Sequence, residues 1–201
     1  MKTVYTSGAI LLLSCALFLL TGCASSPQAR FYTLIATASQ GTPSVQGATP
    51  SVAIASVTIP ELVDRPQLVV RYDDSSVELL ETHRWAEPLK SAVSRAMAEN
   101  LSRLLVSDRV SSYPQAASLS ADFKVYVDLQ RFEYTGKQVE LDALWFVRRQ
   151  DDSPAGNGRS QVREPVTGSG YEGAVAAFSR GLAGVSLEIA QALKKEWSGG
   201  K

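Results

Sequence analysis

Two long segments with apolar residues at every third or fourth position constrain the fold most. They span about 88–105 and 169–198, and each is long enough for several helical turns. The apolar positions are Leu89, Ala92, Val93, Ala96, Met97, Leu101, Leu104 and Leu105 in the first, and Tyr171, Ala174, Val175, Phe178, Leu182, Val185, Ile189, Leu193 and Trp197 in the second. This spacing places them on one side of a helix. The sequence therefore predicts two amphipathic helices that each need an apolar surface to cover.

Shorter segments rich in β-branched and aromatic residues predict strands. They span residues 31–35, 52–59, 68–71, 77–80, 122–134, 139–149 and 159–166, with loops at 37–50 and 151–158. In 122–134, the side chains from Phe123 to Leu129 alternate, with the apolar ones pointing one way. Continuing that alternation puts Tyr126, Phe132 and Tyr134 on the opposite face of the strand.

The order of these elements is strands, helix, strands, helix. This order is typical of α+β domains, and the hairpin-length connections favour antiparallel pairing. We therefore expect a single α+β domain over 31–201, with a mostly antiparallel sheet and two amphipathic helices packed on one of its faces.

The N-terminus has the pattern of a secretory signal. Lys2 precedes an apolar run over 8–20, which is shorter than the roughly 20 residues that a membrane-spanning helix needs. The run ends in Leu20, Thr21, Gly22 and Cys23, which match the bacterial lipobox. We expect residues 1–22 to be a signal peptide and Cys23 to be the lipidated residue, followed by a tether over 23–30. The alternative is an uncleaved membrane anchor in which Cys23 has no role.

Acylation of Cys23 would hold the domain on a membrane without a spanning helix. Each acyl chain, such as palmitate, contributes about 0.8 kcal/mol per buried CH₂, and more than one chain gives stable anchoring. Ala24 follows the cysteine where an Asp would resemble the inner-membrane retention signal. By resemblance to lipoprotein sorting, the expected location is the outer membrane, facing the periplasm.

Charge and cysteine content exclude several classes of function. The 20 basic and 20 acidic residues of the whole chain balance, so no basic field attracts nucleic acid. Cys15 lies in the signal, and Cys23 is assigned to the lipid. A mature chain with no other cysteine has no disulfide framework, cysteine nucleophile or cysteine-based zinc site. We expect no cofactor, no metal and no nucleic acid partner.

Catalytic motifs are also missing from the sequence. His83 is the single histidine, and no serine stands in a nucleophile-elbow motif. The acid pairs Asp73–Asp74 and Asp151–Asp152 lie in predicted turns, where aspartate is common for its own hydrogen bonds. We therefore expect no enzyme. The competing hypothesis is a periplasmic hydrolase that uses His83.

Two segments outside the periodic elements combine prolines, an arginine and apolar side chains. They span residues 60–68 and 84–89. Because Trp and Arg are enriched at interface hot spots, these two segments are candidates for a partner interface. The alternative is that Trp85 fills the core at the helix entrance while Arg84 pairs with Glu87.

With these segments the chain resembles the ABC-type transport auxiliary lipoproteins, including the PqiC-like lipoproteins. The resemblance rests on four features: the lipobox at Cys23, residues 31–34, residues 59–60 followed by 64–69, and residues 84–89 leading into the helix. It covers nearly all of the mature chain.

The resemblance implies an outer-membrane lipoprotein that works with a periplasm-spanning MCE protein and its inner-membrane partners. Such systems move lipids between membranes and maintain envelope integrity, and their auxiliary lipoproteins can form homo-oligomers. The resemblance carries over five motif positions as the candidate partner interface: Arg65, Pro66, Gln67, Arg84 and Trp85. It implies no catalytic residues. The alternative function is a stand-alone periplasmic lipid-binding or scaffold lipoprotein, which needs an apolar pocket between the helices and the sheet.

Overall fold

The computed structural model describes residues 27–41 and 49–199. The predicted signal peptide 1–22, Cys23 and the start of the tether lie outside these ranges. So do residues 42–48 of the predicted loop, and the last two residues of the chain.

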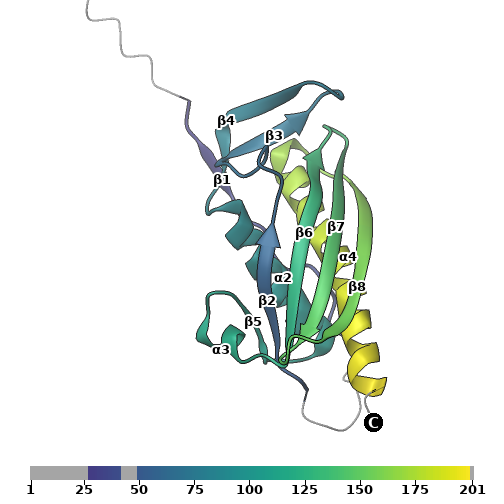
Figure 1. Cartoon of the computed structure of the whole chain (residues 1–201). Coiled ribbons are helices and arrows are strands. Elements are labelled where there is room, and N and C mark those ends of the chain that lie inside the picture. Colours follow the sequence, from purple (N-terminus) through teal and green to yellow (C-terminus); the bar gives the residue numbers. More distant parts are fainter. Residues whose placement is uncertain (1–26, 42–48, 200–201) are drawn as a thin grey trace, which may run out of the picture.

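Eight strands and three helices follow one another along the described residues (Figure 1). The strands are β1 (Arg30–Tyr32), β2 (Val52–Thr58), β3 (Gln67–Arg71), β4 (Val77–Trp85), β5 (Val110–Ser112), β6 (Phe123–Tyr134), β7 (Gln138–Arg149) and β8 (Pro154–Pro165). The helices are α2 (Leu89–Leu105), α3 (Ala116–Leu119) and α4 (Gly170–Gly199). The structure confirms both long helices. It adds β5 and α3, which the sequence did not predict.

The sheet is built around β6 and is mixed. On one side of β6, β7 and then β8 are added as antiparallel neighbours. On the other side β6 pairs in parallel with β2 along its first half and with β3 at its end, through Val70 and Tyr134. Beyond these two strands, β5 pairs in parallel with β2, β4 pairs antiparallel with β3, and β1 pairs in parallel with β4.

The expectation of a mostly antiparallel sheet was therefore wrong. The three tight hairpins, β3–β4, β6–β7 and β7–β8, are antiparallel as their short connections required. The other pairings join strands that lie far apart in the sequence. Parallel neighbours need long crossover connections, and here the chain between β2 and β6 includes α2. Hairpin lengths alone carry no information about these pairings.

Helices α2 and α4 contact each other and the sheet. Helix α2 lies against β2 and β5, while α4 lies against β7 and β8. In Figure 1, α4 runs behind the long strands β6, β7 and β8 along most of its length. The predicted apolar stripes of both helices are almost wholly buried in the core.

A β-bulge in β6 changes which aromatic residues face the helices. Leu129 pairs with Ala143 but Arg131 pairs with Asp142, so Gln130 is one extra residue on β6. Such a bulge reverses the alternation that follows it. Phe132 and Tyr134 are consequently buried with Leu129, and the prediction that they lie on the opposite face was wrong.

The reversal builds an aromatic cluster of Phe132, Phe178 and Trp85. The ring of Phe132 stacks on Phe178 of α4, with centroids 4.1 Å apart and planes 7° apart. Trp85, at the end of β4, presents its ring at steep angles to both, at 6.4 Å and 6.1 Å. Offset-stacked and edge-on arrangements are the favourable geometries for aromatic pairs. The cluster joins β4, β6 and α4.

Strand β8 begins earlier than predicted. Residues 154–158 contain Pro154, Gly156 and Gly158, which led to the expectation of a loop. A Cβ at Gly158 would lie 2.3 Å from the indole ring of Trp145 on β7. The glycine is needed because the indole occupies the place of its side chain, so here it marks close packing within a strand rather than a turn.

The residues that follow β1 form a strap across the two long helices. We use this name for residues 33–41, which are extended but pair with no strand. The N–H groups of Thr37 and Ala38 both donate to Oδ1 of Asn100 on α2, at 3.0 and 2.9 Å. The N–H of Ile35 donates to Oγ of Ser179 on α4, at 3.3 Å. Side chains from both helices therefore provide the hydrogen bonds that a neighbouring strand would otherwise provide.

Two arginines of α2 hold the strap through its carbonyl groups. Arg95 donates to the carbonyl of Leu34 at 3.0 Å, and Arg103 donates to that of Ala36 at 2.9 Å. The strap ends at Gly41, whose N–H donates to the Arg103 carbonyl at 2.9 Å. A Cβ at Gly41 would lie 2.1 Å from the Leu104 carbonyl oxygen, so only glycine fits this approach.

The outward face of β6, β7 and β8 carries a network of ion pairs. Asp142 accepts from Arg159 at 2.9 and 2.7 Å and from Gln161 at 3.1 Å. Its side chain is only 13% exposed. The hydrogen bonds from Arg159 are the main cause that lowers the pKa of Asp142 from 3.8 to about 2.

Replacing Asn100 with Ala should loosen the strap. Two strap N–H groups would lose their acceptor, at a cost of about 1–2 kcal/mol in the free energy of unfolding. Hydrogen exchange should accelerate at the amides of Thr37 and Ala38, and urea denaturation should report the stability loss. Ser91→Ala, on the same helix but solvent-exposed, is the matched control. Unchanged exchange at both amides in the Asn100 variant would contradict this account.

Asp142→Asn should destabilise the domain by about 1 kcal/mol at neutral pH, because a charge-assisted pair with Arg159 is lost. The folded-state pKa is below the unfolded value. The contribution of the carboxylate is therefore complete above about pH 4 and is lost as the pH falls toward 2. Denaturation curves across this range should show wild type and variant converging under acid. A constant difference between wild type and Asp142→Asn across this pH range would refute the assignment.

Candidate partner interface

The five residues of the predicted interface come together at the base of the β3–β4 hairpin. The N–H of Trp85 donates to the Pro66 carbonyl at 2.7 Å, and Gln67 is the register partner of Arg84. The pairing shifts immediately after Gln67, which leaves residues 81–83 bulging out of β4. Two segments that the sequence singled out separately thus form one structural unit.

Within this unit, Trp85 belongs to the core. It is 6% exposed and packs in the aromatic cluster with Phe132 and Phe178. This agrees with the alternative prediction that Trp85 fills the core at the entrance of α2. Its contribution to any interface is therefore indirect, through the position that it gives to the neighbouring hairpin.

Arg84 pairs with Glu81, and the alternative prediction of a pair with Glu87 was wrong. Its guanidinium lies 3.2 Å from the Glu81 carboxylate and also donates to the Glu81 carbonyl at 2.9 Å. Glu87 is held instead by Arg95 at 2.5 Å and by the hydroxyl of Thr33 at 2.9 Å. The hydrogen bond from Arg95 is the main cause that lowers the pKa of Glu87.

The accessible part of the unit is polar. Gln67 donates through Nε2 to the Glu81 carboxylate at 3.3 and 3.4 Å, so Glu81 lies between Gln67 and Arg84. Pro66 is exposed beside them. Nε of Arg65 is buried and has no hydrogen-bond partner among the described residues. We call the group of Arg65, Pro66, Gln67, Glu81 and Arg84 the hairpin-base surface. It can offer guanidinium, amide and carboxylate groups to a partner.

His83 lies among tyrosine side chains rather than beside a nucleophile. Its Nδ1 is hydrogen-bonded to the Tyr32 hydroxyl at 2.8 Å, and its ring lies 4.3 Å from that of Tyr171. Tyr171 in turn meets Tyr134 edge-on at 6.3 Å. Burial is the main cause that raises the pKa of both Tyr32 and Tyr134. Sequence analysis missed this tyrosine group, because its members come from β1, β6 and α4 and share no sequence motif.

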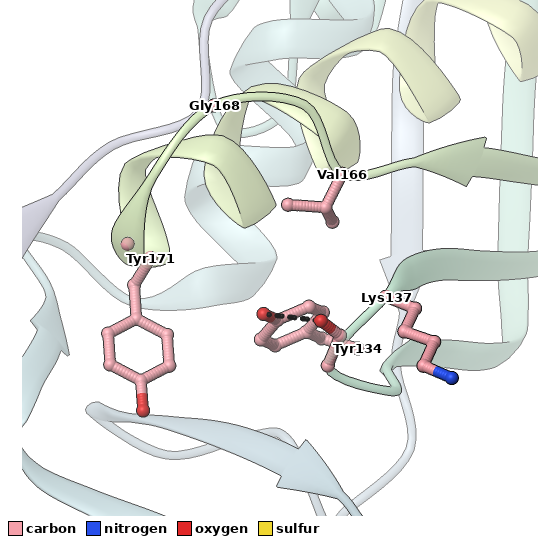
Figure 2. Close-up of a pocket in the computed structure, with 7 residues that line it drawn as sticks. Tyr134, Lys137, Val166, Gly168 and Tyr171 are labelled. Atoms are coloured by element: carbon pink, nitrogen blue, oxygen red, sulfur yellow. Dashed lines mark hydrogen bonds between the residues drawn. The ribbon is translucent and has the colours of Figure 1, made fainter.

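A cavity of about 640 Å³ opens beside the tyrosine group, between the β6–β7 turn and the start of α4 (Figure 2). It is lined by Tyr134, Gly136, Lys137, Val166, Gly168, Gly170 and Tyr171. The Tyr134 hydroxyl donates to the Gly136 carbonyl at 3.2 Å and thus closes one wall. Figure 2 shows the Lys137 ammonium pointing away from the cavity. The polar groups around it form hydrogen bonds within the surrounding turns: besides the Tyr134 hydroxyl, the N–H of Val166 donates to the Lys137 carbonyl at 2.9 Å.

The acid pairs show ordinary turn chemistry. Asp73 accepts hydrogen bonds from the backbone and hydroxyl groups of Ser75 and Ser76. Asp151 does the same for Ser153. Within residues 27–41 and 49–199, no group of three or more histidine, cysteine or acidic side chains has an arrangement that could hold a metal ion. The same part of the chain contains no helix with the length and apolar character needed to cross a membrane.

The sequence of residues 32–190 matches the family model described as "ABC-type transport auxiliary lipoprotein component". The chain belongs to this family of lipoproteins. Membership confirms the resemblance that the lipobox and the hairpin-base motifs indicated. It also gives the protein a membrane-anchored place in the cell envelope and a role as an auxiliary transport component.

Two solved structures share the fold. One is the protein XCC0632 of Xanthomonas campestris, which is 17% identical; the match covers 85% of this chain and 94% of that one, with a TM-score of 0.64. The other, an uncharacterized protein, is 19% identical over 82% and 98% of the two chains, also with a TM-score of 0.64. At these identities the likeness concerns the fold alone. A search of curated proteins found no match.

Trp85 and Arg84 should differ sharply on substitution. Trp85→Ala removes a buried indole from the aromatic cluster and should cost roughly 3–5 kcal/mol in the free energy of unfolding. Arg84→Ala breaks a partly exposed ion pair and should cost less than about 1 kcal/mol. Chemical denaturation of the two variants checks this. Equal losses in both would contradict the assignment of Trp85 to the core and Arg84 to the surface.

Proposed function

We propose that this protein is an outer-membrane-anchored periplasmic lipoprotein. In this role it is an accessory subunit of an MCE-type system that carries lipids between the membranes and maintains the envelope. The observation that carries the proposal is the family match over residues 32–190, together with a lipobox that ends at Cys23, nine positions before the match begins. An auxiliary transport lipoprotein needs both an anchor and a surface for its transporter, and the chain offers a candidate for each.

The proposed anchor is the acylated Cys23. The first strand of the domain, β1, begins at Arg30, seven positions after Cys23. Since two or more acyl chains hold a protein stably on a bilayer, the lipid itself can serve as the membrane attachment. Ala24, in place of an Asp, supports sorting to the outer membrane, where the domain faces the periplasm.

The proposed partner site is the hairpin-base surface. Its Arg84 and Gln67 are pre-positioned around Glu81, so a partner does not need to order them on binding. Arg65 adds a buried Nε that has no hydrogen-bond acceptor within residues 27–41 and 49–199. The partner expected here is an MCE-domain protein. Homo-oligomer formation, which the family resemblance implies, remains part of the proposal.

The packing argues against a stand-alone lipid carrier. That alternative needs an apolar pocket between the helices and the sheet. In the described part of the chain this space is filled by buried side chains such as Phe132, Phe178, Leu182 and Ile189. The tyrosine-lined cavity lies at the end of the sheet instead. Function through docking therefore suits this packing better than function through enclosure of a lipid.

A photoreactive amino acid at Gln67 or Arg84 should form an in-cell crosslink to an MCE-domain protein. After irradiation the protein is purified, and mass spectrometry identifies both the crosslinked partner and the N-terminal peptide. The expected result is an MCE partner together with an acylated Cys23. The physical reason is that both positions lie on the partly exposed hairpin-base surface, where a bound partner would contact the new side chain.

The matched control places the same photoreactive residue at Arg163, an exposed position on β8. Position 163 should yield no MCE crosslink. An MCE protein recovered equally from all three positions would remove the assignment to the hairpin-base surface. If no position yields an MCE protein and Cys23 is acylated, the assignment as a lipoprotein stands and the proposal of an MCE partner is rejected.

A further inference from the structure

Two large apolar side chains point outward from the first folded residues after the proposed anchor. Phe31 is 64% exposed and Ile35 is 54% exposed, whereas Tyr32, Leu34 and Ala36 between and after them are buried. The alternation follows from the extended backbone of β1 and the strap, which places successive side chains on opposite faces. One set packs into the core, and the other is presented to the surroundings.

Their exposure is fixed by the structure around them. Phe31 is held in register with Arg84 by the pairing of β1 and β4. Ile35 is held by its N–H bond to Ser179, and the preceding Leu34 carbonyl by Arg95. Phe31 in β1 and Ile35 in the strap cannot turn inward without breaking these contacts. Both are therefore permanently outward-facing apolar groups.

The distance to the proposed anchor limits where these groups lie. Phe31 lies eight positions after Cys23, which corresponds to at most about 26–29 Å of fully extended chain. Ile35 lies only four residues further along. A membrane that holds an acylated Cys23 is thus always within reach of this edge of the domain.

The charges around the two apolar groups are compatible with a lipid surface. Arg30, next to Phe31, is exposed and could meet lipid phosphates. The neighbouring carboxylates are each engaged by an arginine: Glu172 by Arg30 at 3.2 Å, and Glu87 and Glu99 by Arg95 at 2.5 and 3.5 Å. Paired carboxylates repel an anionic surface less than free ones do.

We propose that Phe31 and Ile35 insert into the interfacial region of the membrane in which Cys23 is anchored, so that the strap side of the domain rests on lipid. The inference depends on the proposed anchor at Cys23. Two side chains bind a bilayer weakly alone, but the anchor makes their contact intramolecular and raises their effective concentration. The proposed binding partner of Phe31 and Ile35 is therefore the lipid bilayer and not another protein.

The test uses the acylated protein and one new cysteine at a time. Cys15 and Cys23 are the only cysteines of the sequence, so after signal removal and acylation an added cysteine is the single free thiol. Phe31→Cys and Ile35→Cys are labelled with the environment-sensitive fluorophore NBD. Each is reconstituted in vesicles of phosphatidylethanolamine and phosphatidylglycerol that contain a spin-labelled lipid quencher. Leu119→Cys on α3, where the native side chain is 67% exposed, is the matched control.

NBD at positions 31 and 35 should emit at shorter wavelength and be quenched at least about twofold more than at position 119. Because only the purified chain and lipid are present, a protein partner cannot produce this difference. Suppose that quenching is equal at all three positions and mass spectrometry shows that Cys23 is acylated. This result overturns the membrane contact, while the anchor and the MCE proposal remain. An unacylated Cys23 in the cell-derived protein overturns the anchor and this inference together.

Discussion

The contact among Trp85, Phe132 and Phe178 decides where the hairpin-base surface lies. The β3–β4 hairpin joins the long strands of the sheet through a single register pair, Val70 with Tyr134. A single pair of residues does not fix the angle between the hairpin and the long strands. The stacked and edge-on rings supply the remaining constraint, because they connect the end of β4 to β6 and to α4 at once. The orientation of Arg84 and Gln67 depends on this buried contact.

The cluster itself depends on the bulge at Gln130. If Gln130 paired in regular alternation after Leu129, Phe132 would point to the outward face of β6 and leave Phe178 without its stacking partner. The ion pairs on that outward face would change as well, since Arg131 and Glu133 also follow the bulge. The bulge thus sorts aromatic residues to the helix side and charged residues to the outer side, although the sequence alternates these classes irregularly at this point.

These dependencies explain what the sequence predicted. Helix α2 was predicted almost to the residue because its apolar spacing is purely local, and the two long hairpins follow from short connections. The parallel pairings, the bulge at Gln130 and the early start of β8 at Pro154 depend on neighbours that are distant in the sequence. No window of local periodicity contains them.

The predicted site likewise has a part that follows from local sequence and a part that depends on distant residues. The motifs around Arg65 and Arg84 were identified, and they do meet, but only the structure separates the buried Trp85 from the polar side chains beside it. Asn100 was missed although a signal existed. It stands within the apolar stripe of α2, between Met97 and Leu104, where a polar side chain is costly unless it has a partner. Its partners are two N–H groups of the strap, some sixty residues earlier in the chain.

The register of β1 on β4 links the two proposed surfaces. Phe31 pairs with Arg84, and Tyr32 pairs with Trp85, so the first strand after the tether lies directly beside the hairpin base. If Phe31 rests in the lipid interface, Arg84 is one strand away from it, about 5 Å. A transporter subunit that binds the hairpin-base surface must then approach close to the anchoring membrane. Under the two proposals together, the domain acts by placing its partner at the bilayer surface, and this role requires neither a catalytic group nor a lipid cavity.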